Sequence, residues 1–258
     1  MTSAAIVVDG LVKRYKGADR NAVDGISFTV DRGSFFTLLG PNGAGKTTTL
    51  NILTTILAPT AGSARVADHD VRAEQSEVRR RVGIIFQTPS LDQNLTGEEN
   101  IRLHAVLYGV FPYRPFYRSM PKEYRDRVME LAGMLGIAAD IFKPVRTYSG
   151  GMKRKLEILR SLMHKPAVLF LDEPTAGLDV MSRRTLWQYL REVRERSGTT
   201  LLLTTHYLEE AEDADAVCII DKGRIVAQGS PAQLKGTAGN AMKLEDAYLR
   251  ILAEEASL

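Results

Sequence analysis

The sequence predicts an α/β fold in which a mostly parallel sheet is flanked by helices. Four short apolar runs support this prediction, because uninterrupted apolar strands are typical of a parallel sheet covered on both faces. Stretches with helical periodicity alternate with these runs, as expected for successive strand–helix units. The four runs are Ser34–Leu39, Val82–Phe86, Ala167–Leu171 and Thr200–Thr204.

The pattern changes on both sides of this core and inside it. Residues 1–30 favour an antiparallel β flank, with Ala22–Val30 as the clearest alternating run. Between Thr96 and about His164 helical patterns dominate, which predicts a helical insert. Gly236–Asn240 is typical of a flexible linker, and Leu244–Leu252 of an amphipathic helix. The predicted domains are 1–236, with a helical subdomain at about 96–164, followed by a linker and C-terminal helix at 237–258.

Composition sets broad limits on function. The 258 residues, 44% hydrophobic and 25% charged, are typical of a soluble globular protein, and a net charge of +3 neither demands nor excludes an acidic partner. The single cysteine, Cys218, excludes an internal disulfide and a multi-cysteine metal site. The N-terminus lacks a secretory pattern, and no apolar run approaches the roughly 18 residues that span a bilayer. We therefore expect any action at a membrane to depend on another chain.

A phosphate-binding loop follows the first apolar run. Gly40–Thr47 matches the pattern G-x-x-x-x-G-K-[ST] and leads into a predicted helix, Lys46–Leu57. Glycines let successive backbone N–H groups point at one anion, and the helix N-terminus adds positive potential. Lys46 is expected to reach the β- and γ-phosphates, and Thr47 to place its hydroxyl on Mg²⁺. The strand–helix context disfavours a chance match, although kinases and GTPases share this loop. The predicted nucleotide contacts here are Asn42, Gly43, Ala44, Gly45, Lys46, Thr47 and Thr48.

Two adjacent acids end the run Ala167–Leu171. Asp172 at a strand end can hold Mg²⁺ beside a triphosphate. Glu173 is then placed to accept a proton from water attacking the γ-phosphate. A strand end capped by a turn would show the same residues, an alternative that the phosphate-binding loop disfavours. Because a kinase needs room for an acceptor hydroxyl, an acid poised for water favours hydrolysis of ATP.

A third motif, Tyr148–Met152, precedes a predicted helix. Ser149 and the two glycines after it can present a hydroxyl and backbone N–H groups to an anion, or Ser149 can simply cap the helix. The order of motifs along the chain favours the first interpretation. That order is the phosphate-binding loop, Gln87 after the second run, Ser149-Gly150-Gly151, Asp172-Glu173, Leu178-Asp179, and His206 after the last run.

This order of motifs resembles that of the ABC ATPases, over nearly the whole chain from Val8 to about Gly229. The resemblance implies a P-loop NTPase core and an ATP-hydrolysing subunit of an ABC transporter. It also implies that two such subunits close head to tail, with each ATP between one subunit's phosphate-binding loop and the other's signature motif. The sequence departs from the commonest signature at Tyr148, where leucine is usual. Together with Thr175–Asp179, the motif looks like the bacterial drug-resistance subfamily, whose members are similar to daunorubicin, nodulation-factor and sodium export ATPases.

The resemblance assigns roles to the signature motif. Ser149, Gly150 and Gly151 would bind the γ-phosphate of the ATP held by the opposing subunit. Asp179 would line the seam of the dimer. Each of these residues would therefore act on a nucleotide that its own phosphate-binding loop does not hold.

Further roles implied by the resemblance fall on residues near the nucleotide. Gln87 would contact Mg²⁺ or the attacking water, and His206 would hold the γ-phosphate and position Glu173. Tyr15 would stack on adenine. Taken alone, a histidine after a strand is more often structural, and Tyr15 can equally be a core aromatic.

The implied cofactors are ATP and Mg²⁺, and the implied partners are an integral membrane permease and a second copy of this chain. The expected location is the cytoplasmic face of the membrane, with attachment through the permease and no nucleic acid bound. Alternatives are a soluble ABC-type ATPase acting on ribosomes or DNA, the ATPase of an importer, and a P-loop kinase. One compact domain with a short insert favours transport, whereas a kinase does not explain the signature motif.

Three basic segments have simpler interpretations. Phe111–Arg118 interleaves aromatic residues with arginines, which can indicate single-stranded nucleic acid. Inside the helical insert a surface loop or protein interface is the better interpretation. The runs Lys153–Lys155 and Arg79–Arg81 are expected to be solvated faces of helices.

Overall fold

The computed structural model describes residues 4–88, 90–236 and 243–255, and the chain divides into two compact units. Each unit is built from segments that are separate in the sequence. The first unit comprises Met1–Val82, Ala167–Glu173 and Gly198–Leu258, and the second comprises Gly83–Pro166 and Pro174–Ser197.

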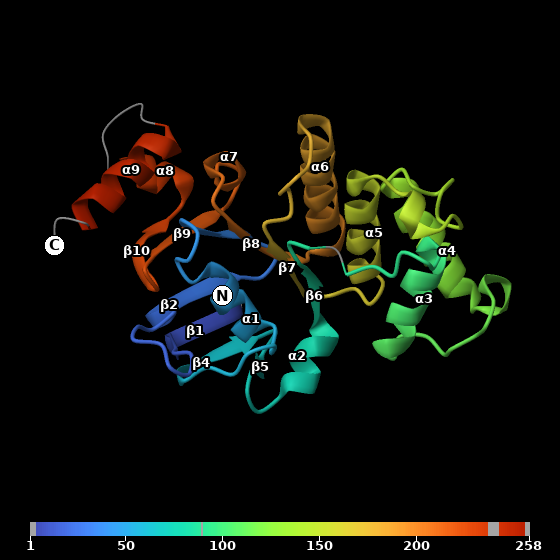
Figure 1. Ribbon diagram of the computed structural model, residues 1–258, viewed down its shortest axis with the longest axis horizontal. Coiled ribbons are helices and arrows are strands. Elements are labelled where there is room, and N and C mark those ends of the chain that lie inside the picture. Colours follow the sequence, from blue (N-terminus) through green and yellow to red (C-terminus); the bar gives the residue numbers. More distant parts are fainter. Residues whose placement is uncertain (1–3, 89, 237–242, 256–258) are drawn as a thin grey trace. The chain divides into compact units, whose positions relative to one another are not determined.

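A mostly parallel sheet forms the centre of the first unit (Figure 1). Its strands are β3 (Phe35–Leu39), β7 (Val168–Asp172), β8 (Thr200–Thr205), β9 (Ala216–Asp221) and β10 (Arg224–Gly229). Within the unit their order is β10-β9-β3-β8-β7, and only the β9–β10 pair is antiparallel. Every residue of β3, β7 and β8 is buried, which explains their uninterrupted apolar sequences. The predicted α/β class is confirmed.

An antiparallel sheet flanks this core. It comprises β1 (Ala4–Lys13), β2 (Val23–Asp31), β4 (Ala61–Val66) and β5 (His69–Asp70), in the order β2-β1-β4-β5. The alternating run predicted for β2 is confirmed by its alternating burial. The strand β4 was not expected from the sequence, because its first three residues are exposed and it contains Gly62. Its strand conformation depends on pairing with β1, where Ile6 lies opposite Val66.

Five helices lie among the described residues of the first unit. They are α1 (Lys46–Leu53), α2 (Gln75–Arg81), α7 (Leu208–Ala211), α8 (Pro231–Gly236) and α9 (Leu244–Glu255). The expectation that α1 reaches Leu57 is wrong, because Thr54 Oγ1 donates to Leu50 O and Thr55 adopts a left-handed φ of 64°. The predicted C-terminal helix is confirmed as α9, which packs against α8 and β10. Of the predicted linker, Gly236 ends α8 and 237–240 lie outside the described residues.

The second unit is mainly helical. It contains β6 (Val82–Ile85, beginning at the unit boundary), α3 (Gly97–Leu107), α4 (Lys122–Met134), α5 (Gly150–Leu162) and α6 (Val180–Ser197). The helical character predicted between Thr96 and His164 agrees with α3, α4 and α5. The helix α6 was not expected from the sequence, and the chain reaches it only after passing through β7 in the first unit.

The segment Phe111–Arg118 is partly anchored and partly exposed. A guanidinium nitrogen of Arg102, a buried residue of α3, donates to the carbonyl oxygens of Arg114 and Pro115. Tyr113 and Phe116 remain 57% and 71% exposed. The expectation of a surface loop agrees with this arrangement.

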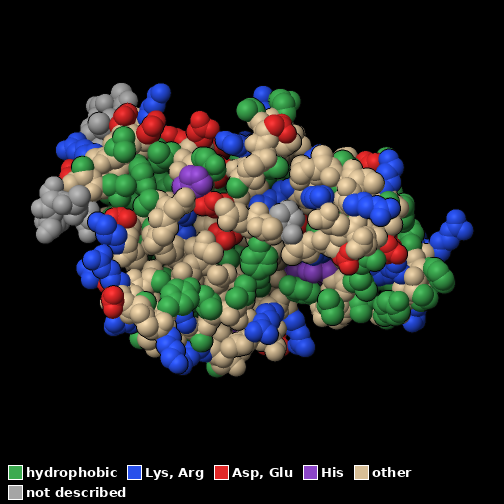
Figure 2. All heavy atoms as spheres, viewed as in Figure 1, with side chains coloured by type: hydrophobic (Ala, Val, Ile, Leu, Met, Phe, Trp, Pro, Cys, Tyr) green, Lys and Arg blue, Asp and Glu red, His purple; other side chains and the backbone are tan. Residues whose placement is uncertain are grey.

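The face drawn in Figure 2 carries basic and acidic side chains interspersed with one another. Charged side chains also pair within helices: on α2, Arg80 and Arg81 both form ion pairs with Glu77. Within the described part of the chain, none of the helices combines the length and the apolar character needed to cross a bilayer.

Candidate functional site

The phosphate-binding loop connects β3 to α1 in the first unit, as the sequence predicted. Gly45 precedes the first helical residue and has a φ of 105°, a conformation that glycine adopts without strain. A Cβ atom at Gly45 would collide with the carbonyl oxygen of Ala22, and one at Gly40 with that of Ile220. Both glycines are therefore required by the close approach of neighbouring backbone. Asn42 and Gly43 lie exposed at the loop's outer side, and Ala44 is buried.

Lys46 is folded back over this loop. Its Nζ donates to Gly40 O at 2.7 Å and to Pro41 O at 3.0 Å, and the residue is only 5% exposed. Burial lowers the pKa of Lys46, and the nearby carboxylates of Glu173 and Asp172 oppose part of that shift. The ammonium group thus occupies the loop that a phosphate group would enter.

Asp172 ends β7 beside the start of α1. Its Oδ1 accepts a hydrogen bond from Thr47 Oγ1 at 3.1 Å and another from Thr204 Oγ1 at 2.5 Å. Asp172 is 5% exposed, and Thr204 is fully buried. The structure therefore brings together Thr47 and Asp172, two of the three side chains that the sequence predicted to contact Mg²⁺, and places Thr204 beside Asp172.

Glu173 directs its carboxylate to a different partner. His206 Nδ1 lies 3.0 Å from Glu173 Oε1, and because an ionised carboxylate only accepts, the imidazole is the donor. Glu173 has a φ of 45°, in the left-handed region that non-glycine residues seldom occupy, and its N–H donates to Thr204 O. Strain of this kind is concentrated at functional sites. The two consecutive acids therefore bind different partners: Asp172 binds Thr47 and Thr204, and Glu173 binds His206.

The turn after β8, which positions His206, is fixed by a buried pair. Thr205 Oγ1 donates to Glu210 Oε2 at 2.5 Å and accepts from Tyr207 N at 2.9 Å. Both Thr205 and Glu210 are buried. Thr204 and Thr205 were not among the expected site residues, although two threonines that end an apolar strand just before a candidate histidine were a usable signal.

Tyr15 lies next to the phosphate-binding loop. Its hydroxyl is 3.3 Å from Thr48 Oγ1, and the residue is 43% exposed. Lys13 Nζ lies 5.7 Å from the centre of the ring. The alternative that Tyr15 is a core aromatic is wrong, because its ring is too exposed.

The signature residues lie in the second unit. Ser149 caps α5 by accepting a hydrogen bond from Met152 N at 3.2 Å, and Gly150 has open space where a Cβ would stand. A Cβ at Gly151 would come within 3.1 Å of Ser182 Oγ. Asp179 in turn accepts from Ser182 N and Ser182 Oγ, which lowers the pKa of Asp179. The start of α5 and the start of α6 are therefore close, as a shared site would require.

Gln87 is exposed in the bend that follows β6. The residue before it is held by Arg154 of α5, whose guanidinium donates to Phe86 O at 2.5 Å and to Pro174 O at 2.7 Å. Arg154 also pairs with Glu157 at 3.0 Å, and both side chains are at most 5% exposed. The expectation that Lys153–Lys155 is a solvated face is therefore wrong for Arg154. A buried ion pair at i and i+3 has the same sequence pattern as an exposed one.

Tyr148, the departure from the usual signature, anchors the segment before α5. Its hydroxyl donates to Asp140 O at 2.7 Å, and burial raises the pKa of Tyr148 to about 12. The same hydroxyl lies so close to Gly97 that a Cβ there would collide with it. Tyr148 therefore ties the signature motif to the start of α3.

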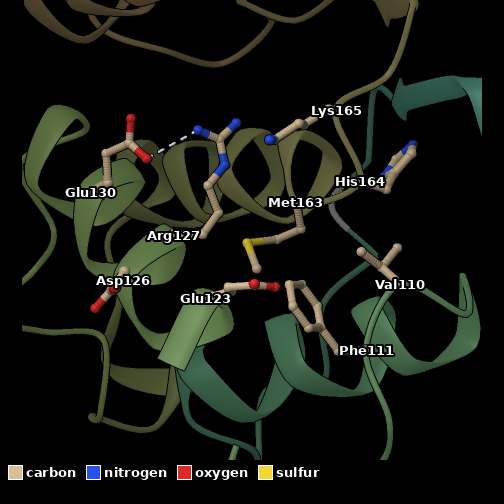
Figure 3. Close-up of a pocket in the computed structure, with 9 residues that line it drawn as sticks. All are labelled: Val110, Phe111, Glu123, Asp126, Arg127, Glu130, Met163, His164 and Lys165. Carbon is tan, nitrogen blue, oxygen red and sulfur yellow. Dashed lines mark hydrogen bonds and ion pairs between the residues drawn. The ribbon is translucent and has the colours of Figure 1, made fainter. Parts of the chain in front are cut away.

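The second unit also contains a pocket of about 550 Å³ (Figure 3). Apolar and charged side chains share its walls, and Arg127 pairs with Glu130 at 3.1 Å within it. Its lining residues are Val110, Phe111, Glu123, Asp126, Arg127, Glu130, Met163, His164 and Lys165. None of the predicted nucleotide-binding residues lines it.

The oxygen atoms near the phosphate-binding loop suit a magnesium ion. Mg²⁺ prefers hard oxygen ligands and is usually held by one or two protein groups together with phosphates and water. Thr47 and Asp172 supply two such groups in contact with each other. Over residues 4–88, 90–236 and 243–255, no group of three or more His, Cys, Asp or Glu side chains forms a metal cage. The residues present therefore fit an ion that arrives with the nucleotide.

Comparison with known proteins identifies the family of this chain. The family model described as "ABC transporter" matches residues 23–176. The chain is 43% identical over 254 residues to the daunorubicin/doxorubicin resistance ATP-binding protein of Streptomyces peucetius, covering 97% of this chain and 73% of the relative. It is 44% identical over 228 residues to the Nod factor export ATP-binding protein I of Ralstonia nicotianae, covering 88% and 67%.

Solved structures give the same answer for the fold. An ATP-binding subunit of an ABC transporter superposes with a TM-score of 0.83 at 28% identity, covering 96% of this chain and 99% of that one. A bacterial ABC transporter cassette solved as a dimer superposes with a TM-score of 0.76 at 26% identity, covering 87% and 98%. The chain therefore belongs to the ABC transporter family, as an ATP-binding and ATP-hydrolysing subunit of the drug-resistance and export type.

Proposed function

We propose that this chain hydrolyses Mg²⁺-bound ATP to drive export of a drug, lipid-like or glycan-like small molecule through a separate membrane subunit. Its similarity to a daunorubicin/doxorubicin resistance protein and to a Nod factor export protein supports export. The observation that best supports ATP hydrolysis is that the two adjacent carboxylates have different partners. Asp172 contacts Thr47, and Glu173 contacts His206. The molecule transported would be selected by the membrane subunit.

Nucleotide binding is assigned to the loop between β3 and α1. Lys46 would exchange its bonds to Gly40 O and Pro41 O for the β- and γ-phosphates of ATP. Thr47 and Asp172 would hold Mg²⁺, which when bound neutralises charge on those phosphates. The backbone of Asn42–Gly45 and the Thr48 hydroxyl would complete the cradle, and Tyr15 would stack on adenine.

Hydrolysis is assigned to Glu173 and His206. Glu173 would accept a proton from the water that attacks the γ-phosphate. The bond from His206 Nδ1 to Glu173 Oε1 fixes the orientation of the carboxylate, and Nε2 of the same ring, when it also carries a proton, would donate to a γ-phosphate oxygen. Gln87 would contact the attacking water or Mg²⁺ once the nucleotide is in place.

The second copy of the chain would complete the site. Ser149, Gly150 and Gly151 of one subunit would bind the γ-phosphate held by the other, and Asp179 would line the seam. A similar cassette has been solved as a dimer, which supports this arrangement. The N-terminus of α5, with Ser149 as its cap, provides the backbone N–H groups that attract an anion.

The membrane subunit is expected to contact the helical unit. Leu107, Tyr113 and Phe116 are 84%, 57% and 71% exposed there and supply apolar surface. Attachment through such a contact would hold the chain at the cytoplasmic face of the membrane.

The shared site is tested by mixing two variants. Ser149→Ala impairs the signature motif and Glu173→Gln removes the base, so each homodimer is expected to hydrolyse little ATP. A mixed dimer contains one site in which both residues are intact, and activity should therefore exceed that of either variant alone. Wild-type activity in Ser149→Ala alone would refute the shared site.

Export is tested with the membrane subunit present. The chain and its permease in inside-out membrane vesicles should take up a daunorubicin-type drug only when ATP is supplied. Glu173→Gln in the same vesicles serves as the control. ATP-driven release of drug from these vesicles would instead indicate an importer.

A further inference from the structure

Asp172 accepts two hydrogen bonds on the same carboxylate oxygen. Thr47 Oγ1 and Thr204 Oγ1 both donate to Oδ1, at 3.1 Å and 2.5 Å. Within the described residues, neither bond involves Oδ2. Both hydroxyl groups therefore bind one oxygen of the carboxylate, and neither of them binds Oδ2.

Thr204 contacts both acids of the site. It lies opposite Asp172 in the parallel pairing of β7 and β8, and its carbonyl oxygen accepts a hydrogen bond from Glu173 N at 3.0 Å. The carbonyl bond can be made by any residue at this position. The hydroxyl of Thr204, in contrast, serves Asp172 alone.

The bond from Thr204 is not a general consequence of burying a threonine in this sheet. Thr37 lies in β3, next to β8, and is also fully buried. Its hydroxyl has no hydrogen-bond partner among the described residues. The hydrogen bond from the Thr204 hydroxyl is therefore specific to its position opposite Asp172.

The two hydroxyl donors differ in what else they do. Thr47 is half of the proposed metal-binding pair, so its oxygen is engaged once Mg²⁺ is present. Thr204 is fully buried behind the carboxylate and has no such second task. It is the donor that can hold Asp172 in one orientation with and without nucleotide.

We propose that Thr204 is a positioning residue that fixes the Asp172 carboxylate so that Oδ2 faces the Mg²⁺ of bound ATP. This inference rests on the proposed Mg²⁺-dependent function. Groups that orient a metal ligand commonly affect metal affinity about 10–100-fold when they are removed. Thr204 acts through Asp172 and does not touch the nucleotide.

The test compares Mg²⁺-dependent with Mg²⁺-independent nucleotide binding. Thr204→Val matches threonine in shape but lacks the hydroxyl. Binding of a fluorescent ATP analogue is titrated with Mg²⁺ and, separately, in EDTA. The Mg²⁺ concentration for half-maximal enhancement should rise about 10–100-fold, while affinity in EDTA should stay unchanged. Thr204→Ser, which restores a hydroxyl, should return most of the Mg²⁺ response.

Thr37→Val is the matched control, because it makes the same change at a buried position of the same sheet. It should leave the Mg²⁺ response unchanged. If Thr204→Val does not fold, Thr204→Ala removes the hydroxyl without adding an apolar methyl group.

Two results would overturn the role of Thr204. One is a wild-type Mg²⁺ response in the variant that lacks the hydroxyl, and the other is an equal loss of affinity with Mg²⁺ and with EDTA. A wild-type protein whose nucleotide binding ignores Mg²⁺ would overturn the proposed metal dependence as well. The Mg²⁺ response of the wild type therefore distinguishes a wrong role for Thr204 from a wrong assignment of Mg²⁺ dependence.

Discussion

His206 Nδ1 lies 3.0 Å from Glu173 Oε1, although 33 residues separate them in the sequence. Glu173 follows β7 and His206 follows β8, and these strands are parallel neighbours. Because the carboxyl ends of adjacent parallel strands meet at one edge of the sheet, two residues that each follow a strand become partners. The exposed fractions of the two side chains are 12% for Glu173 and 33% for His206, so the pair is reachable but partly shielded from water.

Replacing the base should separate ATP binding from hydrolysis. Glu173→Gln keeps the size and polarity of the side chain but cannot accept the proton, so we expect the turnover rate to fall about 10²–10⁴-fold. ATP binding should remain, and the ATP-bound variant should accumulate as a dimer. Phosphate release and size-exclusion chromatography with ATP measure the two effects. Glu209→Gln, at an exposed position of α7, is the control. Unchanged hydrolysis in Glu173→Gln would exclude Glu173 as the base.

Two glycine substitutions should have opposite effects. Gly40→Ala places a Cβ against Ile220 O, and overpacking of this kind costs about 1–3 kcal/mol of unfolding free energy. It should also abolish nucleotide binding by distorting the phosphate-binding loop. Gly133→Ala, in α4, meets no atom within 4 Å and should stabilise the protein by about 0.5–1 kcal/mol. Urea unfolding and nucleotide binding test both variants, and normal binding by Gly40→Ala would show that the loop tolerates the displacement.

The buried pair Arg154–Glu157 should be costly to break at one end. Arg154→Met leaves Glu157, whose side chain is 1% exposed, without its ion-pair partner, and the expected loss of stability is about 3–5 kcal/mol. The double variant Arg154→Met, Glu157→Leu should regain much of this loss, since no buried charge is then left uncompensated. Lys153→Met, at a half-buried neighbouring position, should have little effect. Equal urea midpoints for Arg154→Met and Lys153→Met would contradict the burial of this pair.

His104 should make stability fall as the pH is lowered. Burial, with smaller contributions from Arg160 and His164, lowers the pKa of His104 from 6.5 to about 3 in the folded protein. The unfolded chain therefore binds a proton below pH 6.5 that the folded chain rejects, so stability is retained above pH 6.5 and is lost as the pH falls toward 3. Between pH 7 and pH 5, protonation of His104 in the unfolded chain lowers the free energy of unfolding by about 2 kcal/mol.

The measurement is urea unfolding across that pH range. His104→Phe keeps an aromatic ring against Tyr108, whose ring centre lies 4.3 Å from that of His104, but does not titrate. Its unfolding free energy should vary less with pH than that of the wild type. The same pH dependence in both proteins would assign the effect to other groups.

The fold was largely predictable because its core strands are buried along their whole length. The burial of β3, β7 and β8 leaves no polar face, and their sequences show it directly. The strand β4 and the helix α6 were not assigned. Four of the six residues of the strand are exposed, and its conformation depends on pairing with β1. The helix buries Leu186, Leu190 and Val193 within a sequence rich in charged residues, so its apolar face is narrow.

Within the site, residues belonging to a motif were predictable and residues that only support them were not. Lys46, Thr47, Asp172 and Glu173 were named from local patterns, and the structure brings them together in one unit. Arg154 was expected to be solvated, because a charged run on a helix looks the same whether one of its members is buried or not. The tertiary structure shows that it is part of the interior, through its burial, its ion pair with Glu157 and its contacts with Phe86 O and Pro174 O.

The sequence by itself determined the chemistry of this protein: a phosphate-binding loop, two adjacent acids after a buried strand, and a serine–glycine motif before a helix. These features are local, because each depends on residues next to one another in the chain. The tertiary structure decided which oxygen of Asp172 is bound by Thr204, and that Glu173 faces His206. Such contacts join strands that are distant in sequence, and their geometry is set by the register of the parallel sheet, which no local pattern specifies.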